Sequence, residues 1–430
     1  MNATADTTGS ISPLRSGLTL AMLSLVSVLS MADRVLLGIV TEPVKHELAL
    51  SDTQMSLANG FLFVAFNMIA GLFIARWVDH ANRKRILALG LAIWTGATAL
   101  TGLAHDFGVL ALSRTLVGAG EATVVPVAFS MIADLYRPAA RPRAVGFFQA
   151  ANFVGIVGGS VLAGVLSAIH GWRSMFIMFG AAGVGLLLLL LLLPEPRRMD
   201  QQPSDASLPS DGLWSAIRAV SRIPGFWLLG LGLGCSGMGV SVLAAWAPAF
   251  LQRSHGVPLA EVGAVTGPAI GIGGISGTLL AGFVASMLVR RRGADSASLL
   301  IPIVALPLSA PCFAGLVLLP SLAGALVSAG LMNFLLSAVV APCMALGLAI
   351  VAPRQRGLAA TLLLVAQGLI AGGLAPFLVG LLSDILSPRL GVDSLRYAIL
   401  SMAPAPLVAT ALLWMAKRRM APGTEPTRQP

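Results

Sequence analysis

Four charged side chains lie inside long apolar stretches of the sequence, where a charge usually has a functional reason. They are Asp33 and Arg34 in the stretch 17–41, and Arg114 and Glu121 in the stretch 108–135. A charge at the centre of a bilayer costs about 3 kcal/mol or more. Two acids and two bases form a neutral set, which is what a site of low dielectric requires. These side chains are therefore the candidates for proton transfer and for anion binding.

The spacing of the four residues predicts which of them meet. Arg114 and Glu121 are seven positions apart, which places them on one face of a helix and ~10.5 Å apart along its axis. Counted from the membrane surface at which the stretch 17–41 ends, Arg114 lies ~9 Å deep, Asp33 ~12 Å and Glu121 ~20 Å. Asp33 is therefore expected to bridge to Arg114. Arg34 points ~100° away from Asp33, as a hook for an anion or as a second ion-pair partner.

A carboxyl group in a poorly hydrated cavity keeps its charge only while a cation stays close to it. This predicts a proton-coupled switch with Glu121 and Asp33 as proton sites, in which protonation frees Arg114 or Arg34 to bind an anionic group. Which of the two acids carries the proton is left open. A static charge cluster that only specifies helix packing is the alternative.

The elements that must position these residues are membrane-spanning helices. Of the 430 residues, 56% are hydrophobic and 11% charged, with a mean hydropathy of +0.86. Each apolar stretch is long enough to cross a hydrocarbon core of ~30 Å. We predict an all-α polytopic membrane protein with twelve transmembrane helices. The expected spans are 17–41, 54–76, 86–105, 108–135, 144–169, 172–193, 224–251, 261–289, 299–319, 321–350, 357–385 and 395–416.

The chain divides into two related six-helix bundles. The predicted regions are an N-terminal tail (1–16), a first bundle (17–193), a linker (194–222), a second bundle (223–416) and a C-terminal tail (417–430). The linker is rich in Pro, Ser and Asp and ends in a possible amphipathic surface turn. Arg-x-Arg at 141–143 recurs at 354–356, Gly-Gly at 158–159 recurs at 372–373, and GVLS at 164–167 recurs as GLLS at 380–383. Three matches in order at nearly one offset indicate a duplicated half, a common plan for transporters.

The distribution of basic residues predicts the orientation. If both termini are cytoplasmic, cytoplasmic pieces hold 21 of the 28 Lys and Arg residues, outer loops hold five, and two are intramembrane. This asymmetry satisfies the positive-inside rule and accounts for the net charge of +10. We therefore expect a multi-pass protein of a bacterial inner membrane, surrounded by lipid and monomeric, with no nucleic-acid partner.

The segment ARWVDHANRKR (75–85) joins the second and third predicted spans. It resembles the signature loop of the major facilitator superfamily, roughly G-x-x-x-D-R-x-G-R-R/K, through Asp79 and the pair Arg83-Lys84. Ala75, His80 and Asn82 depart from the pattern. Asn82 is a mild departure, since Asn tolerates the left-handed conformation that Gly would supply at a tight turn.

This resemblance implies the major facilitator fold, two pseudo-symmetric six-helix bundles, and a cytoplasmic latch in the loop. In the latch, Asp79 would accept from helix N-terminal amides or pair with Arg356, and Arg83 would pair with Asp134. The alternative is that a basic loop with one acid only orients the chain.

The segments MADRVLLG and SRTLVGAGEATVVPVAFSMIADLYRP resemble the Spinster-like branch of this superfamily, in which an Asp-Arg pair in the first span and Arg-x6-Glu in the fourth recur. The resemblance implies a secondary transporter that moves an amphipathic anionic substrate, a lysolipid or similar molecule, by alternating access. The alternatives are a small organic anion/proton symporter or a multidrug exporter of the same superfamily.

Other polar residues within spans could line the cavity or bond to a neighbouring helix. They are Asn67, Asn152, Asn333 and Gln367. The five histidines fall at predicted loops, no HExxH or Walker A motif occurs, and the three cysteines have no metal-type spacing. We therefore expect no enzyme activity, no metal and no cofactor, with protons as the coupling ion.

Overall fold

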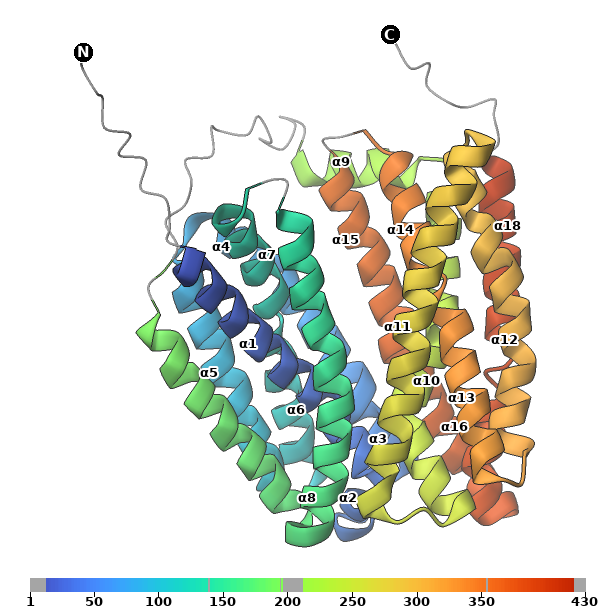
Figure 1. Cartoon of the computed structure of the whole chain (residues 1–430). Coiled ribbons are helices and arrows are strands. Elements are labelled where there is room, and N and C mark those ends of the chain that lie inside the picture. The colour runs from blue at the N-terminus through green and yellow to red at the C-terminus, as the bar shows by residue number, and fades with distance from the viewer. Residues whose placement is uncertain (1–12, 138–139, 194, 196–211, 353–354, 421–430) are drawn as a thin grey trace, which may run out of the picture.

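The computed structural model describes residues 13–137, 140–193, 195, 212–352 and 355–420. The described residues form helices joined by short turns, with no strand among them (Figure 1). This confirms the predicted all-α class.

The first half of the chain contributes eight α-helices and one π-helical turn among its described residues up to 193. They are α1 (Pro13–Ile39), α2 (Thr41–Glu47), α3 (Asp52–Ser56), the π-helical turn η1 (Leu57–Leu62), α4 (Phe63–His80), α5 (Arg83–Gly102), α6 (Phe107–Glu121), α7 (Val124–Leu135) and α8 (Arg141–Leu192). The spans α3–η1–α4 and α6–α7 are each a single crossing with an internal irregularity.

The second half repeats this plan. Its elements are α9 (Gly212–Ser221), α10 (Phe226–His255), α11 (Leu259–Arg292), η2 (Asp295–Leu299), α12 (Leu300–Leu318), α13 (Leu322–Ser337), α14 (Val340–Ala349), α15 (Arg356–Gln367), the π-helical η4 (Gly368–Leu374), α16 (Ala375–Leu390), η5 (Gly391–Asp393), α17 (Ser394–Leu400) and α18 (Ala405–Arg419). The amphipathic turn predicted before the seventh span is the helix α9.

Ten described stretches are long and apolar enough to cross a membrane. Two of them, 143–192 and 356–419, have 50 and 64 residues, far more than the ~20 that one crossing needs. Gly171 interrupts the first with a φ of 80°, and Gly391 interrupts the second with a φ of 54°. Only glycine adopts such φ values readily. Each long stretch therefore crosses twice, which gives the twelve crossings that the sequence predicts.

The two bundles stand side by side (Figure 1). The start of α1 and the end of α18 lie at one end, which we call the terminal end. The opposite end, which carries α2 and α3, is the distal end. Between the halves, α8 packs against α11, α1 against α10, and α3, η1 and α4 against η4 and α16. The ribbons of the two bundles diverge toward the terminal end (Figure 1).

Glycine permits the closest contacts between the halves. A Cβ at Gly263 of α11 would overlap the carbonyl oxygen of Ser160 in α8. A Cβ at Gly380 of α16 would overlap Ser56 in α3. Small residues let helix backbones approach in membranes, where apolar side chains gain little by leaving lipid.

Candidate transport site

The helix that carries Arg114 and Glu121 ends just after the glutamate. Pro126 has no amide hydrogen, so the carbonyl of Ala122 four residues earlier loses its helical partner. The chain accordingly turns at Ala122 and Thr123, and the Thr123 hydroxyl donates to the Gly120 carbonyl at 2.9 Å. Glu121 is thus the last residue of α6, at a break within a membrane span.

Glycines next to Glu121 bring two other helices close to α6. A Cβ at Gly118 would overlap the Phe63 carbonyl of α4, and one at Gly120 would come within 2.7 Å of the Gly90 carbonyl of α5. On the far side of the site, Gly159 of α8 lies against Ala32 of α1. The glycines of the segment SRTLVGAGE therefore let the backbones of α4 and α5 contact α6, and this close packing positions Arg114 and Glu121.

Arg34 and Glu121 form the first of two ion pairs in this region. The Nε atom of Arg34 lies 2.7 Å from Oε2 of Glu121. The Glu121 side chain is fully buried, whereas 36% of the Arg34 side chain is exposed. The other oxygen of Glu121, Oε1, is buried and has no hydrogen-bond partner among the described residues. Arg34 is thus the member of the set that solvent or a ligand reaches.

Asp33 and Arg114 form the second pair, which is longer and fully enclosed. Oδ1 of Asp33 lies 3.9 Å from Nη1 of Arg114, and each side chain is 1% exposed. The Thr98 hydroxyl of α5 donates to Oδ2 of Asp33 at 2.8 Å. Within the described structure, Oδ1 of Asp33 and both Nε and Nη1 of Arg114 lack hydrogen-bond partners. The predicted bridge is therefore present as a loose contact with spare hydrogen-bonding capacity.

Phe63 lies against both arginines. Its ring centroid is 5.2 Å from Cζ of Arg34 and 5.4 Å from Cζ of Arg114, within cation–π range. The ring follows directly on η1, a π-helical turn of a kind often found at functional sites. One aromatic face thus supports the two cations, while the two carboxylates pair with them from other directions.

Three of the four predicted polar candidates bond to neighbouring groups. Asn67 donates to the Gly118 carbonyl at 2.9 Å, and Asn333 donates to the Ile270 carbonyl at 2.6 Å. Asn152 accepts from the Ser27 hydroxyl at 2.5 Å, which ties α8 to α1. Gln367 is half-buried at the end of α15. The three asparagines join helices to one another, as polar residues in spans often do.

Comparison with known proteins identifies the family of the chain. Residues 23–345 match the family described as Major Facilitator Superfamily. The chain belongs to this superfamily. Its family and fold are those of transporters and not of enzymes.

Individual relatives place the chain more closely. A crystal structure of a bacterial homologue of the human lysosomal transporter Spinster, inward-facing and unoccupied, is 27% identical, with a TM-score of 0.86 over 95% of this chain and 98% of its own. An MFS-type efflux pump of Mycolicibacterium smegmatis is 32% identical over 95% of this chain and 94% of the pump. A probable L-galactonate transporter of Escherichia coli is 28% identical over 63% of this chain and 62% of its own. The Spinster-like resemblance is confirmed.

The signature loop of the superfamily lies at the terminal end. Arg83, 1% exposed, pairs with Asp134 at the end of α7 and also donates to the Ser130 hydroxyl at 3.2 Å. Lys84 donates to the Leu191 carbonyl at 2.8 Å. Arg356 is exposed at the start of α15. The side chain of Asp79 lies outside the described part of the structure, so the predicted Asp79–Arg356 contact stays a prediction.

The interpretation of Asn82 as a left-handed turn residue is wrong. Its φ of −68° and ψ of 112° are extended, and its side chain accepts a hydrogen bond from the Arg85 amide at 2.8 Å. Asn82 is therefore the N-cap of α5, because its short side chain satisfies an amide that the first helical turn leaves free.

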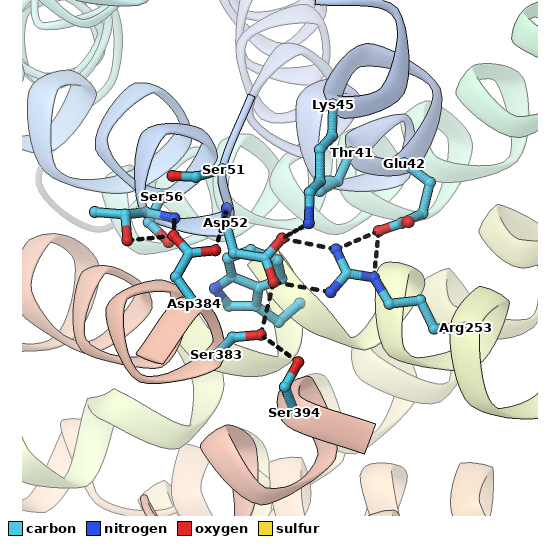
Figure 2. Close-up of polar contacts among 12 residues, drawn as sticks. Thr41, Glu42, Lys45, Ser51, Asp52, Ser56, Arg253, Ser383, Asp384 and Ser394 are labelled. Atoms are coloured by element: carbon cyan, nitrogen blue, oxygen red, sulfur yellow. Dashed lines mark hydrogen bonds and ion pairs between the residues drawn. The ribbon is translucent and has the colours of Figure 1, made fainter. Parts of the chain in front are cut away.

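Sequence reasoning missed a polar cluster at the distal end. Arg253 falls beyond the predicted end of its span, but α10 continues to His255 and carries Arg253 in its last turn. There it meets Asp52 and Glu42, and Asp384 of α16 lies beside them (Figure 2). Opposite charges at the ends of separate spans were the sequence signal that could have predicted this cluster. The prediction of orientation instead treated each of these residues as an isolated charge in a loop.

Glu47 anchors α2 to the hairpin turn within α8. It accepts from Nε of Arg173 at 2.8 Å and from the indole of Trp172 at 2.6 Å. The hydrogen bond from Arg173 and then that from Trp172 hold the pKa of Glu47 below its usual range. The distal helix α2 is therefore fixed to its own bundle through Glu47, while its Glu42 faces the other bundle.

Proposed function

We propose that the protein is a proton-coupled secondary transporter of an amphipathic, anionic, lipid-like molecule such as a lysolipid. The observation that carries this proposal is the pair of ion pairs Arg34–Glu121 and Asp33–Arg114 on adjacent helices, of which only Arg34 is substantially exposed. Ionisable side chains inside a span mark the path of a substrate or a proton.

Proton coupling follows from how each carboxylate is held. Glu121 has one oxygen on Arg34 and one without a hydrogen-bond partner in the described structure. A proton on that free oxygen would remove the charge that holds Arg34. The arginine would then present its guanidinium to an anion. In the reverse direction, loss of the anion returns Arg34 to Glu121 and favours release of the proton.

Asp33 and Arg114 offer a second step of the same kind, shielded from the substrate. The 3.9 Å separation leaves room for the pair to tighten or part, and Thr98 keeps Asp33 oriented. Because each arginine of the site is paired with a carboxylate that can take up a proton, we propose protons as the coupling ion, with no metal or other cofactor.

The lipid-like part of the substrate is inferred from the second half. Its spans carry no charged residue away from their ends. An apolar wall opposite a charged one suits a molecule with an anionic head and an acyl or aromatic tail. The solved Spinster homologue, with its TM-score of 0.86, supports a transporter of this fold.

A small organic anion is the second candidate. The E. coli relative is named as a probable L-galactonate transporter, and a sugar acid also presents a carboxylate to an arginine. The mycobacterial relative is named as an efflux pump, which makes drug export the remaining alternative. These candidates differ in the tail of the substrate and not in the charge chemistry.

We also propose that the terminal end faces the cytoplasm of a bacterial inner membrane. The basic residues gathered there, including Arg290–Arg292 at the end of α11 and Lys417–Arg419 at the end of α18, support this orientation. The partners are then membrane lipids and the transported molecule, for a protein that works as a monomer without nucleic acid.

Reconstitution in liposomes with an imposed pH gradient tests the proposal. Uptake or release would be followed for a panel of lysolipids, sugar acids and other organic acids, with and without a protonophore. We expect lysolipid movement that depends on the gradient and collapses with the protonophore. Movement of organic acids alone would replace the lipid assignment, and movement indifferent to the gradient would overturn proton coupling.

A further inference from the structure

Arg253 of the second half binds two carboxylates of the first half at the distal end. Its Nη1 and Nη2 atoms each lie 2.8 Å from an oxygen of Asp52, a bidentate contact, and its Nε lies 2.7 Å from Glu42. The side chains of Arg253 and Asp52 are 12% and 3% exposed. Bidentate pairs of arginine and carboxylate combine strength with fixed geometry. Figure 2 shows the guanidinium between the two acids.

Asp384, which also belongs to the second half, contacts the first half as a hydrogen-bond acceptor. Its Oδ1 accepts from the Asp52 amide at 2.9 Å, and its Oδ2 accepts from the Thr53 amide at 2.7 Å and from the Thr53 hydroxyl at 2.5 Å. These amides begin the span α3–η1–α4 and have no partner within their own helix. A carboxylate from α16 therefore caps a helix of the other bundle, where the helix dipole favours negative charge (Figure 2).

Ser383, the residue before this cap, completes the network. Its hydroxyl donates to Oδ2 of Asp52 at 2.6 Å, while Lys45 donates to Oδ1 of the same carboxylate at 2.6 Å. Asp52 is thus held by both bundles at once. We call the set Glu42, Asp52, Arg253, Ser383 and Asp384 the distal clasp.

Polar contacts between the two halves gather near the distal end. They include those of Asp384 with the start of α3, of Arg253 with Glu42, and of Gln252 with the Ile39 carbonyl. The ion pair of Arg83 and Asp134 at the terminal end lies within the first half. Spans two and eleven are therefore joined by polar groups at the distal end.

We propose that the distal clasp is the element that holds the distal end closed, and that it must separate whenever the site opens in that direction. Separation returns Asp52, Asp384 and Arg253 to water, which solvates each of them and offsets part of the lost attraction. The clasp is therefore a reversible lock, and its strength sets the resting balance between the two orientations. This inference uses neither the substrate nor proton coupling.

Distance measurements between paired spin labels test the lock on the full chain without substrate. One pair, Leu103→Cys with Val392→Cys, uses exposed sites in the two halves at the distal end. A second pair, Arg85→Cys with Arg292→Cys, uses exposed sites at the terminal end. Both are placed in a background in which Cys235, Cys312 and Cys343 are replaced.

Arg253→Gln and Asp384→Ala are expected to add a longer distance for the distal pair and a shorter one for the terminal pair. The ratio of distally closed to distally open molecules should fall about tenfold or more, because truncating one partner of a desolvated charge pair usually costs more than a tenfold change requires. Asp384→Asn, which keeps one acceptor, should give a smaller shift in the same direction.

Arg396→Gln is the matched control, since Arg396 pairs at 3.2 Å with Asp393 of its own half. It should leave both distance distributions unchanged. If Arg253→Gln fails to fold, Asp384→Ala and Asp384→Asn carry the test by themselves. Unchanged distributions in the clasp variants, or an equal shift in the control, would overturn the lock.

Discussion

The Nε atom of Arg34 lies 2.7 Å from Oε2 of Glu121, although the two residues are 87 positions apart in the sequence. Its neighbour Asp33 faces Arg114 instead, seven residues earlier on the same helix as Glu121. Asp33 and Arg34, which are adjacent in α1, therefore pair with different charged residues of α6. Because one pair is tight and partly exposed and the other loose and enclosed, the two can change charge state in different steps.

Glu121→Gln is expected to abolish the dependence of transport on pH. The amide cannot lose a proton or hold Arg34 as a carboxylate does, so the arginine remains free for the anion at every pH. Asp33→Asn should also abolish it, because the second carboxylate that can take up a proton, the partner of Arg114, is lost. Transport rates against pH in proteoliposomes provide the measurement. Glu261→Gln, an exposed glutamate in the first turn of α11, is the matched control. Normal proton-coupled uptake in both site variants would contradict the proton-site assignment.

Phe63→Leu should lower transport without unfolding the protein. Leucine keeps an apolar side chain there but loses the ring that faces Arg34 and Arg114, and each such contact is worth about 0.5–2 kcal/mol. We expect roughly a tenfold loss in transport at limiting substrate, with a change of only a few degrees in the melting temperature. Phe61→Leu, which alters a ring that lies tilted against Phe377 and not against the two arginines, is the comparison. Equal losses in the two variants would assign Phe63 to packing alone.

Arg83→Met should destabilise the first bundle strongly, because it leaves Asp134 buried without its cation. Removing one partner of a buried pair costs about 3–5 kcal/mol. The double variant Arg83→Met with Asp134→Leu should recover much of this loss. Denaturant unfolding in detergent gives the four free energies of the cycle. Additive losses would show that the two side chains act independently, and Arg85→Met, at an exposed site, should be neutral.

The contact of α2 with the turn in α8 should weaken at low pH. Glu47 has a lowered pKa in the folded protein because Arg173 and Trp172 bind its carboxylate. Its contribution is therefore complete above the unfolded pKa of about 4.3 and is lost as pH falls through the lower folded value. The stability difference between the protein and Glu47→Gln should shrink across that acidic range. A constant difference down to the lowest pH would contradict the ion-pair origin.

The sequence determined the number of membrane crossings and the depth of the buried charges along their helices. Hydrophobic length counts crossings directly, since one span needs a fixed number of apolar residues. The first span is expected at 17–41 and observed within Pro13–Ile39, and the eighth is expected at 261–289 and observed as Leu259–Arg292. Rise per residue also placed Asp33 at the depth of Arg114, where the structure has their contact. These features depend on position along a single helix.

The tertiary structure decided which side chains meet across helices. The pairing of Arg34 with Glu121 depends on the tilt of α1 and on glycines that let α4 and α5 approach α6. The distal clasp joins Asp52, Arg253 and Asp384, three span ends that are separated by more than a hundred residues each. Rise and hydrophobic period fix depth and face within one helix but not the rotation of one helix against another. That rotation is set by packing between the bundles, and so the clasp emerged only from the fold.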